Sequence, residues 1–167
     1  MSPVRPSLAA IWPSFTLFPL AGVALLLLGA GRDGVLIAIG LVLLGLNAAI
    51  VANYAYWTTL RVEGDELVYR TLFGARVERV ALGSLQRIDA KRYPGAHSGV
   101  SAPHFVARGR DSVVRVNTKP YRLADFVGLI EVIRGVNRRV ELDPFWSRVA
   151  AGEDVTKEIA AVPRSRL

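Results

Sequence analysis

Two long apolar stretches dominate the first third of the chain. No charged residue occurs in residues 11–31 or in residues 34–57, and only the tetrad Gly31-Arg32-Asp33-Gly34 separates the two stretches. A transmembrane helix needs roughly 20 mostly apolar residues, so each stretch is long enough to cross a bilayer once. Because the connection is so short, the two crossings must fold back on each other. The pattern predicts a transmembrane helical hairpin over residues 1–57.

The first stretch also has some features of a secretory signal peptide, since LAGVALLLLGAG is apolar and ends in small residues. A signal peptide would begin with a more basic segment, whereas this chain has only Arg5 there, among prolines. Aromatic residues also begin early, at Trp12. These features favour a retained helix over a cleaved one.

After Thr58 the apolar positions alternate, which is the period of a β-strand. Two strands are expected within residues 59–73, on either side of a turn at Gly64-Asp65. Further strands are expected at 75–82, at 84–93 and, as a hairpin, within 104–118. The segment between Pro94 and Pro103 is rich in Pro, Gly, Ser and His, which is typical of a loop.

Residues 121–137 change to helical spacing. Their predicted helix has one stripe that consists of Leu123, Phe126, Val127, Ile130, Ile133 and Asn137. Several antiparallel strands followed by one amphipathic helix predict an α+β domain over residues 58–143. We expect the helix to cover one end or face of a small bent sheet, and residues 144–167 to form a C-terminal tail.

The order of these features resembles the bacterial pleckstrin-homology-like (PH-like) domain. The similar segments are LRVEGDELVYRTLFG, LGSLQRIDA and NTKPYRLADFVGLIEVIRGVNRRV. The resemblance implies a seven-stranded partial barrel plugged at one open end by the helix, placed directly after a two-helix membrane hairpin. It also implies recognition of a protein surface or peptide. Relatives that bind phosphoinositides have a basic first hairpin loop, but here that loop, Glu63–Glu66, is acidic.

The charged residues are concentrated after the two apolar stretches. All but two of the 21 basic residues and all but one of the 14 acidic residues follow residue 60. Because positive charge near the ends of spans favours the cytoplasmic side, Arg61 and Arg70 place the domain in the cytoplasm. We therefore expect a multi-pass protein of the bacterial inner membrane with both termini cytoplasmic.

Aromatic residues support this orientation, because Trp and Tyr prefer the boundary between headgroups and hydrocarbon. They occur at the start of the first stretch and at the end of the second, and a hairpin brings these two ends into one leaflet. The expected interface anchors are Trp12, Phe15, Phe18, Tyr54, Tyr56 and Trp57.

Small residues predict how the two helices pack. Gly45, Ala49 and Asn53 are four residues apart, and small residues let helices approach closely in lipid. The expected partners in the first helix are Gly22 and Gly29, which are seven apart. A transport path past Asn47 and Asn53 is the weaker alternative, since two spans alone cannot enclose a pore.

No set of residues points to catalysis. His97 and His104 lie in or beside the Pro/Gly/Ser loop without enough acidic neighbours for a metal site. The sequence has no nucleophile elbow and no glycine-rich phosphate loop, and the absence of cysteine excludes disulfides and thiolate ligands. We expect no enzyme, cofactor, metal or small-molecule substrate. Nucleic-acid binding is also not expected, because a basic face with stacking aromatics is lacking.

The remaining chemical signal is a group of basic strand ends with neighbouring aromatic residues. The candidate contact residues are Arg87, Lys91, Arg92, Tyr93, Phe105, Arg108, Arg110, Phe145 and Trp146. The adjacent Phe145 and Trp146 serve either a partner or docking of the tail onto its own domain.

We interpret the chain as a non-enzymatic membrane protein whose domain binds another protein, as an accessory or assembly subunit of a larger membrane complex. The alternative function is binding of anionic lipid headgroups, since each Lys or Arg near such a surface contributes about 1 kcal/mol. An ordinary solvated surface of mixed charge explains the same basic residues without a ligand.

Overall fold

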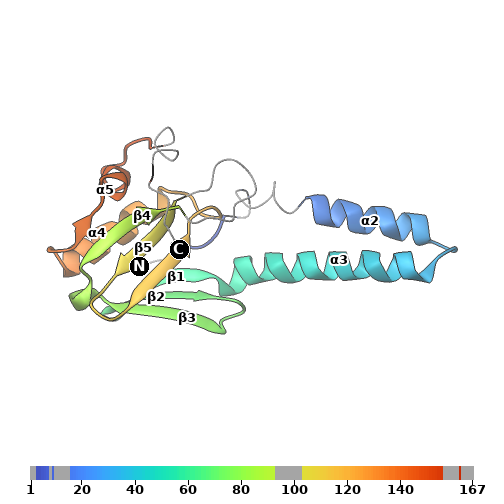
Figure 1. Ribbon diagram of the computed structural model, residues 1–167, viewed down its shortest axis with the longest axis horizontal. Helices are drawn as coiled ribbons and strands as arrows, with labels where there is room; N and C mark the ends of the chain where they lie inside the picture. The colour runs from blue at the N-terminus through green and yellow to red at the C-terminus, as the bar shows by residue number, and fades with distance from the viewer. Residues whose placement is uncertain (1–2, 8, 10–15, 93–102, 156–161, 163–167) are drawn as a thin grey trace.

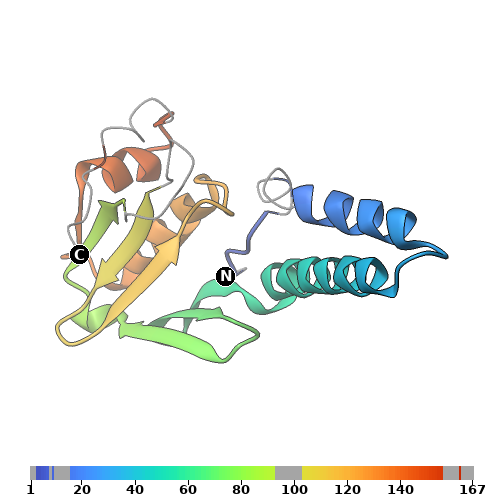
Figure 2. The ribbon, with the colours of Figure 1, turned by 45° about the vertical axis from the view of Figure 1, so that its right-hand side comes forward.

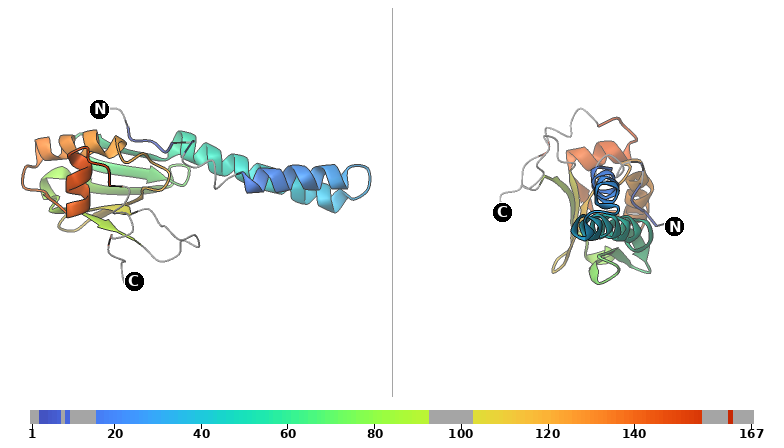
Figure 3. Two further views of the ribbon diagram at one scale, coloured as in Figure 1. Left: turned by 90° about the horizontal axis from the view of Figure 1, so that it is seen from above. Right: turned by 90° about the vertical axis from the view of Figure 1, so that its right-hand side faces the viewer.

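The protein has an α+β fold in which two apolar helices extend from a domain of strands and helices (Figure 1). The computed structural model describes residues 3–7, 9, 16–92, 103–155 and 162. The helices lie at one end of the elongated molecule, and both sheets lie at the other (Figures 2 and 3).

The longest helix begins at Gly34. Helix α3 (Gly34–Ala52) continues without a break into a single π-helical turn, η1 (Asn53–Trp57). Together these 24 residues are apolar enough and long enough to cross a membrane, since they span about 36 Å at 1.5 Å per residue. Helix α2 (Leu17–Gly29) has 13 residues and spans about 20 Å. Most of the earlier part of the expected first span lies outside the described residues.

A tight turn joins the two helices. The backbone N–H groups of Arg32 and Asp33 both donate to the carbonyl oxygen of Gly29, at 3.0 Å. The Asp33 side chain then caps α3 by accepting from the N–H groups of Val35 (2.8 Å) and Leu36 (3.4 Å), which otherwise lack helical partners. As a result, α2 and α3 run antiparallel and side by side (Figures 1 and 3).

The first sheet is antiparallel, in the order β1-β2-β3. Its strands are β1 (Thr59–Glu63), β2 (Glu66–Thr71) and β3 (Arg76–Ala81). Gly64 adopts φ +61°, a conformation that glycine enters without steric cost. The predicted strand pair around Gly64-Asp65 is thereby confirmed, with Glu63 opposite Glu66.

The second sheet has the order β6-β5-β4-β7. Its strands are β4 (Arg87–Lys91), β5 (His104–Arg108), β6 (Val113–Asn117) and β7 (Glu141–Leu142). Strand β7 follows the long domain helix and pairs parallel to β4. The two sheets meet where the Arg115 N–H of β6 donates to the Glu78 carboxylate of β3 at 2.7 Å.

The core lies between the sheets and two helices. Helix α4 (Asp125–Val136) buries Phe126, Ile130 and Ile133 of its predicted stripe. Helix α5 (Pro144–Ala150) adds Trp146, whose ring centroid lies 5.1 Å from those of both Phe105 and Phe126. Such aromatic pairs contribute about 0.5–1.5 kcal/mol beyond their buried area. The core therefore continues past residue 143 into the predicted tail.

One residue, Thr58, separates the long helix from β1. Its N–H (2.9 Å) and its hydroxyl (3.1 Å) both donate to the carbonyl oxygen of Asn53. The Asn53 side-chain oxygen accepts from the N–H of Phe73, in the β2–β3 turn, at 2.6 Å. The helix end is thus bonded to two parts of the first sheet.

The segment before the helices returns to the same domain. Val4 and Leu60 exchange two backbone hydrogen bonds, of 2.8 and 3.0 Å, and the Ser7 N–H donates to the Pro120 carbonyl at 2.6 Å. The Val4 side chain is buried in the domain core. We call this pairing of Val4 with Leu60 the N-terminal strap. It joins the chain before α2 to the chain after η1.

Candidate partner-binding surface

The predicted aromatic contact residues lie inside the domain. Phe105 and Trp146 are fully buried, and Phe145 is nearly so. The Phe145 and Trp146 ring centroids are 5.2 Å apart, and both side chains pack into the core. The structure therefore favours docking of Phe145 and Trp146 onto their own domain over contact with a partner. These three side chains are not exposed to a partner.

Two of the predicted basic residues bind an acidic side chain that the sequence analysis did not connect to them. The guanidinium of Arg87 lies 2.5 Å from one Asp89 carboxylate oxygen, and that of Arg108 lies 3.0 Å from the other. Arg87 and Arg108 are opposite each other in the β4–β5 register, where like charges would repel. Asp89, only 8% exposed, lies between them and pairs with both, which reduces their repulsion.

Lys91 and Arg92 lie at the other end of β4, about 13 Å from Arg87 along the strand. The Arg92 side chain donates to the Val162 carbonyl oxygen at 2.7 Å, so it holds part of the C-terminal segment. Tyr93 lies outside the described residues. The predicted contact set therefore does not form one surface.

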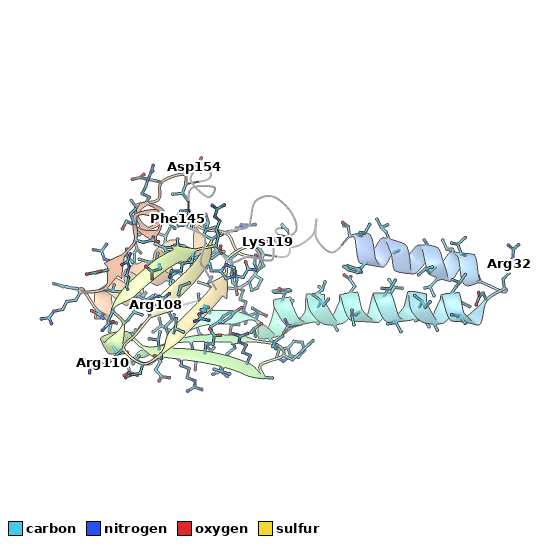
Figure 4. The ribbon with its side chains drawn as sticks, viewed as in Figure 1. Arg32, Arg108, Arg110, Lys119, Phe145 and Asp154 are labelled. Carbon is cyan, nitrogen blue, oxygen red and sulfur yellow. The ribbon has the colours of Figure 1, made fainter. Side chains whose placement is uncertain are left out.

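A hollow that we call the distal groove lies at the Arg87 end of the domain. It has a volume of about 790 Å³ and is lined by Gly83, Ser84, Leu85, Gln86, Arg87, Arg110, Asp111, Asn137, Arg139 and Glu141. In Figure 4, Arg110 lies at the opposite end of the molecule from Arg32 in the helical turn. The groove therefore faces away from the apolar helices.

Asn137 is bonded within the groove lining, whereas two of the lining cations form no ion pair within the described residues. The Asn137 amide donates to the Leu82 and Leu85 carbonyl oxygens at 2.8 Å each. Arg110 and Arg139 are exposed, and neither forms a salt bridge within the described residues. A guanidinium pairs well with a carboxylate through two parallel hydrogen bonds. The groove can therefore hold acidic side chains.

A smaller hollow, which we call the proximal pocket, lies between β2, β3, β5 and β6. It has a volume of about 300 Å³ and is lined by Tyr69, Thr71, Arg76, His104, Arg115 and Asn117. Burial lowers the pKa of His104, partly offset by a hydrogen bond with the Lys91 backbone, so the imidazole is neutral at pH 7. Arg76 is paired with Glu78 at 2.5 Å.

The helix-packing residues divide into two groups. Gly22 and Gly29 face α3 as predicted, because a methyl group added to either would lie 2.9 Å from a Leu44 or a Leu36 atom, respectively. Gly45 and Ala49, in contrast, are exposed, and nothing lies near the added methyl of Gly45.

The residues of α3 that do meet α2 include one glycine that the sequence analysis missed. A methyl group on Gly40 would lie 2.8 Å from the Gly22 carbonyl oxygen. Asn53, the third predicted packing residue of this helix, bonds to the first sheet instead.

The predicted interface aromatics are described in part. Trp12 and Phe15 lie outside the described residues, and Phe18 is exposed near the start of α2. At the other helix end, Tyr54 is half-buried, whereas Tyr56 and Trp57 are exposed. The Trp57 ring contacts that of Phe73 at a centroid distance of 5.2 Å.

Within the part of the chain that the structure describes, no group of three His, Asp or Glu residues could hold a metal ion. Comparison with protein-family models, with curated proteins and with solved structures gave no match. The PH-like fold implied by the sequence therefore stays a prediction.

Proposed function

We propose that this is a non-enzymatic membrane protein whose distal groove binds an acidic segment of another protein. The observation that carries the proposal is a pair of exposed guanidinium groups, Arg110 and Arg139, which form no salt bridge within the described residues. They line the groove at the end of the domain opposite the apolar helices. A groove so placed is open to a partner in the aqueous phase. The protein would then serve as an accessory or assembly subunit of a larger complex.

Membrane anchoring through both helices supports this arrangement. Helix α3 with η1 is long enough to cross, and α2 runs antiparallel beside it. The N-terminal strap holds the chain before α2 against the domain, so both outer ends of the helix pair lie on one side. The excess of Lys and Arg after residue 60 favours the cytoplasmic side of a bacterial inner membrane. Tethering there raises the effective concentration of the domain for membrane partners.

The test compares two charge reversals of equal size. Arg110→Glu with Arg139→Glu should remove partner subunits that co-purify with the full chain in mild detergent. Lys119→Glu with Arg122→Glu, which changes two exposed cations outside the groove lining, should retain them. Equal retention by both variants would contradict a role for the groove.

A second candidate function is binding of anionic lipid headgroups. It is favoured by the half-buried Lys91 and Arg92 and by the cations of the proximal pocket. If lipid binds there, anionic lipid in nanodiscs should raise the thermal unfolding midpoint of the full chain, because a ligand stabilises the state it binds. Lys91→Glu with Arg92→Glu should abolish that rise, and an unchanged rise would exclude these two residues as the headgroup site.

A further inference from the structure

The turn between β2 and β3 exposes two large apolar side chains. Leu72 is 55% and Phe73 is 52% exposed. They lie next to the end of the long helix, where the Phe73 ring contacts Trp57, and Trp57 in turn contacts Tyr56 at 5.9 Å. We call these four residues (Tyr56, Trp57, Leu72 and Phe73) the apolar tip.

The backbone holds the two turn residues in an unusual conformation. Leu72 (φ 51°) and Phe73 (φ 55°) both adopt the left-handed region, which bulky residues avoid because of steric crowding. The turn is fixed by the Ala75 N–H, which donates to the Leu72 carbonyl at 3.0 Å, and by the bond between the Phe73 N–H and the Asn53 side chain. The exposed position of these side chains is therefore built into the fold.

The place of the tip in the molecule indicates what covers it. Strand β1 leaves the helix end and β2 returns antiparallel to it, so the β2–β3 turn lies beside η1 and the β1–β2 turn lies at the far end (Figure 1). The 24-residue helix exceeds the roughly 30 Å hydrocarbon core, so its last residues, Tyr56 and Trp57, belong at the headgroup level. Leu72 and Phe73 extend the apolar surface of Tyr56 and Trp57 away from the helix axis, at the same end of the helix.

We propose that Leu72 and Phe73 insert into the boundary between lipid headgroups and acyl chains, beside the end of α3. Arg76 is opposite Thr71 in the next strand, and its guanidinium stays paired with Glu78. This second membrane contact orients the domain, and the inference rests on the membrane anchoring of the proposed function. With the tip in the lipid, the distal groove is held facing the aqueous phase.

The absence of cysteine from the chain allows a direct test with single labels. Spin labels attached to Leu72→Cys and, separately, Phe73→Cys in the full chain in lipid nanodiscs should be accessible to oxygen and shielded from a water-soluble nickel reagent. The matched control is Val136→Cys, an apolar side chain on α4 that is 59% exposed, where the nickel reagent should have free access. Ile39→Cys, within α3, is the anchor control and should be the deepest site.

The outcomes separate this inference from the anchoring itself. If labels at both turn positions behave like the Val136 label while the Ile39 label is deep, insertion of the tip is wrong and anchoring stands. If the Ile39 label is open to the nickel reagent, anchoring is wrong and the inference fails with it. Adding Phe73→Ser to the labelled Leu72→Cys chain should move that label to a shallower depth.

Discussion

At the residue scale, single polar side chains join parts of the chain that are far apart. One Asp143 oxygen accepts from the Trp146 N–H at 2.9 Å and so caps α5, while the other accepts from the Ala90 N–H of β4. Asn53 joins the helix end to the β2–β3 turn in the same way. A buried N–H group without an acceptor costs free energy. These side chains stabilise the domain by accepting hydrogen bonds from such backbone groups.

Asp143→Ala should lower the free energy of unfolding by about 1–3 kcal/mol, because it removes an N-cap and leaves the Ala90 N–H without its partner. The change is measured as a lower thermal midpoint together with altered Trp146 fluorescence. Asp143→Asn keeps the capping oxygen for the Trp146 N–H but turns an amide NH2 donor toward the Ala90 N–H, so it should lose only somewhat less than Asp143→Ala. Equal losses in the two variants would show that the cap is not what stabilises α5.

The His104 imidazole predicts a pH dependence. Burial holds its pKa below the ordinary value of 6.5 in the folded state, so the unfolded chain binds the proton first as pH falls. Stability is therefore complete above about pH 6.5 and decreases below it, until the lowered folded pKa is reached. The thermal unfolding midpoint should decrease as the pH is lowered from 7.5 to 5.5, and His104→Gln should make that decrease smaller.

The Glu63 carboxylate contributes at lower pH and does not obscure this effect. Hydrogen bonds from Arg61 and Arg70 lower the pKa of Glu63, so its stabilising effect is lost only as pH falls below its ordinary value of 4.5. An undiminished loss between pH 7.5 and pH 5.5 in His104→Gln would assign it to another group.

The burial and the partners of single side chains are the features that the sequence predicts least well. The Phe145-Trp146 pair has no periodicity around it that separates a core position from a surface one, and only the tertiary fold places Trp146 against Phe126. Asp89 is close in sequence to Arg87, but its second partner, Arg108, is brought in by strand pairing. Ion pairs of this kind depend on register and are not visible as a local motif.

At the element scale, period and turn chemistry predicted the strands and α4 well. The stripe of α4 is an example, with Phe126, Ile130 and Ile133 buried as expected. Strand β6 alternates between buried and less buried positions, whereas β4 and β5 each bury three consecutive residues. Helix α3 carries apolar residues on every side, so its pattern does not mark which side meets α2. Gly40 rather than Gly45 makes the close approach, a difference in steric fit that the apolar pattern does not reveal.

Gly40→Leu should lower the thermal midpoint of the full chain in detergent, because even a first methyl group would lie 2.8 Å from the Gly22 carbonyl oxygen. Gly45→Leu makes the same chemical change on the open side of the same helix and should leave the midpoint nearly unchanged. Equal effects of the two substitutions would mean that helix propensity, not packing against α2, determines the response.

At the scale of the whole molecule, the α+β class and the abrupt change from apolar helices to a charged domain both follow from the sequence. The N-terminal strap does not, because a lone Val4 among prolines gives no strand signal. Val4 pairs with backbone groups of Leu60 at the free edge of β1.

The strap predicts that the two outer ends of the helix pair lie on the same side of the membrane. In inverted membrane vesicles, Arg5→Cys and Val136→Cys, both at exposed positions, should react with a membrane-impermeant maleimide. Arg32→Cys in the helical turn should react only from the opposite side. Labelling of Arg5→Cys and Arg32→Cys from the same side would rule out the hairpin topology.

The strap also sets an order of events during synthesis. Leu60 follows both helices in the chain, so its pairing with Val4 must wait until both have been made and their outer ends have come together. A chain with only one helix inserted would leave Val4 and Leu60 on opposite faces of the bilayer, with a gap in the domain core where Val4 belongs. If the helix pair crosses the membrane as proposed, completion of the folded domain reports that insertion has been completed, and an incompletely inserted chain leaves exposed the apolar surface that Val4 covers.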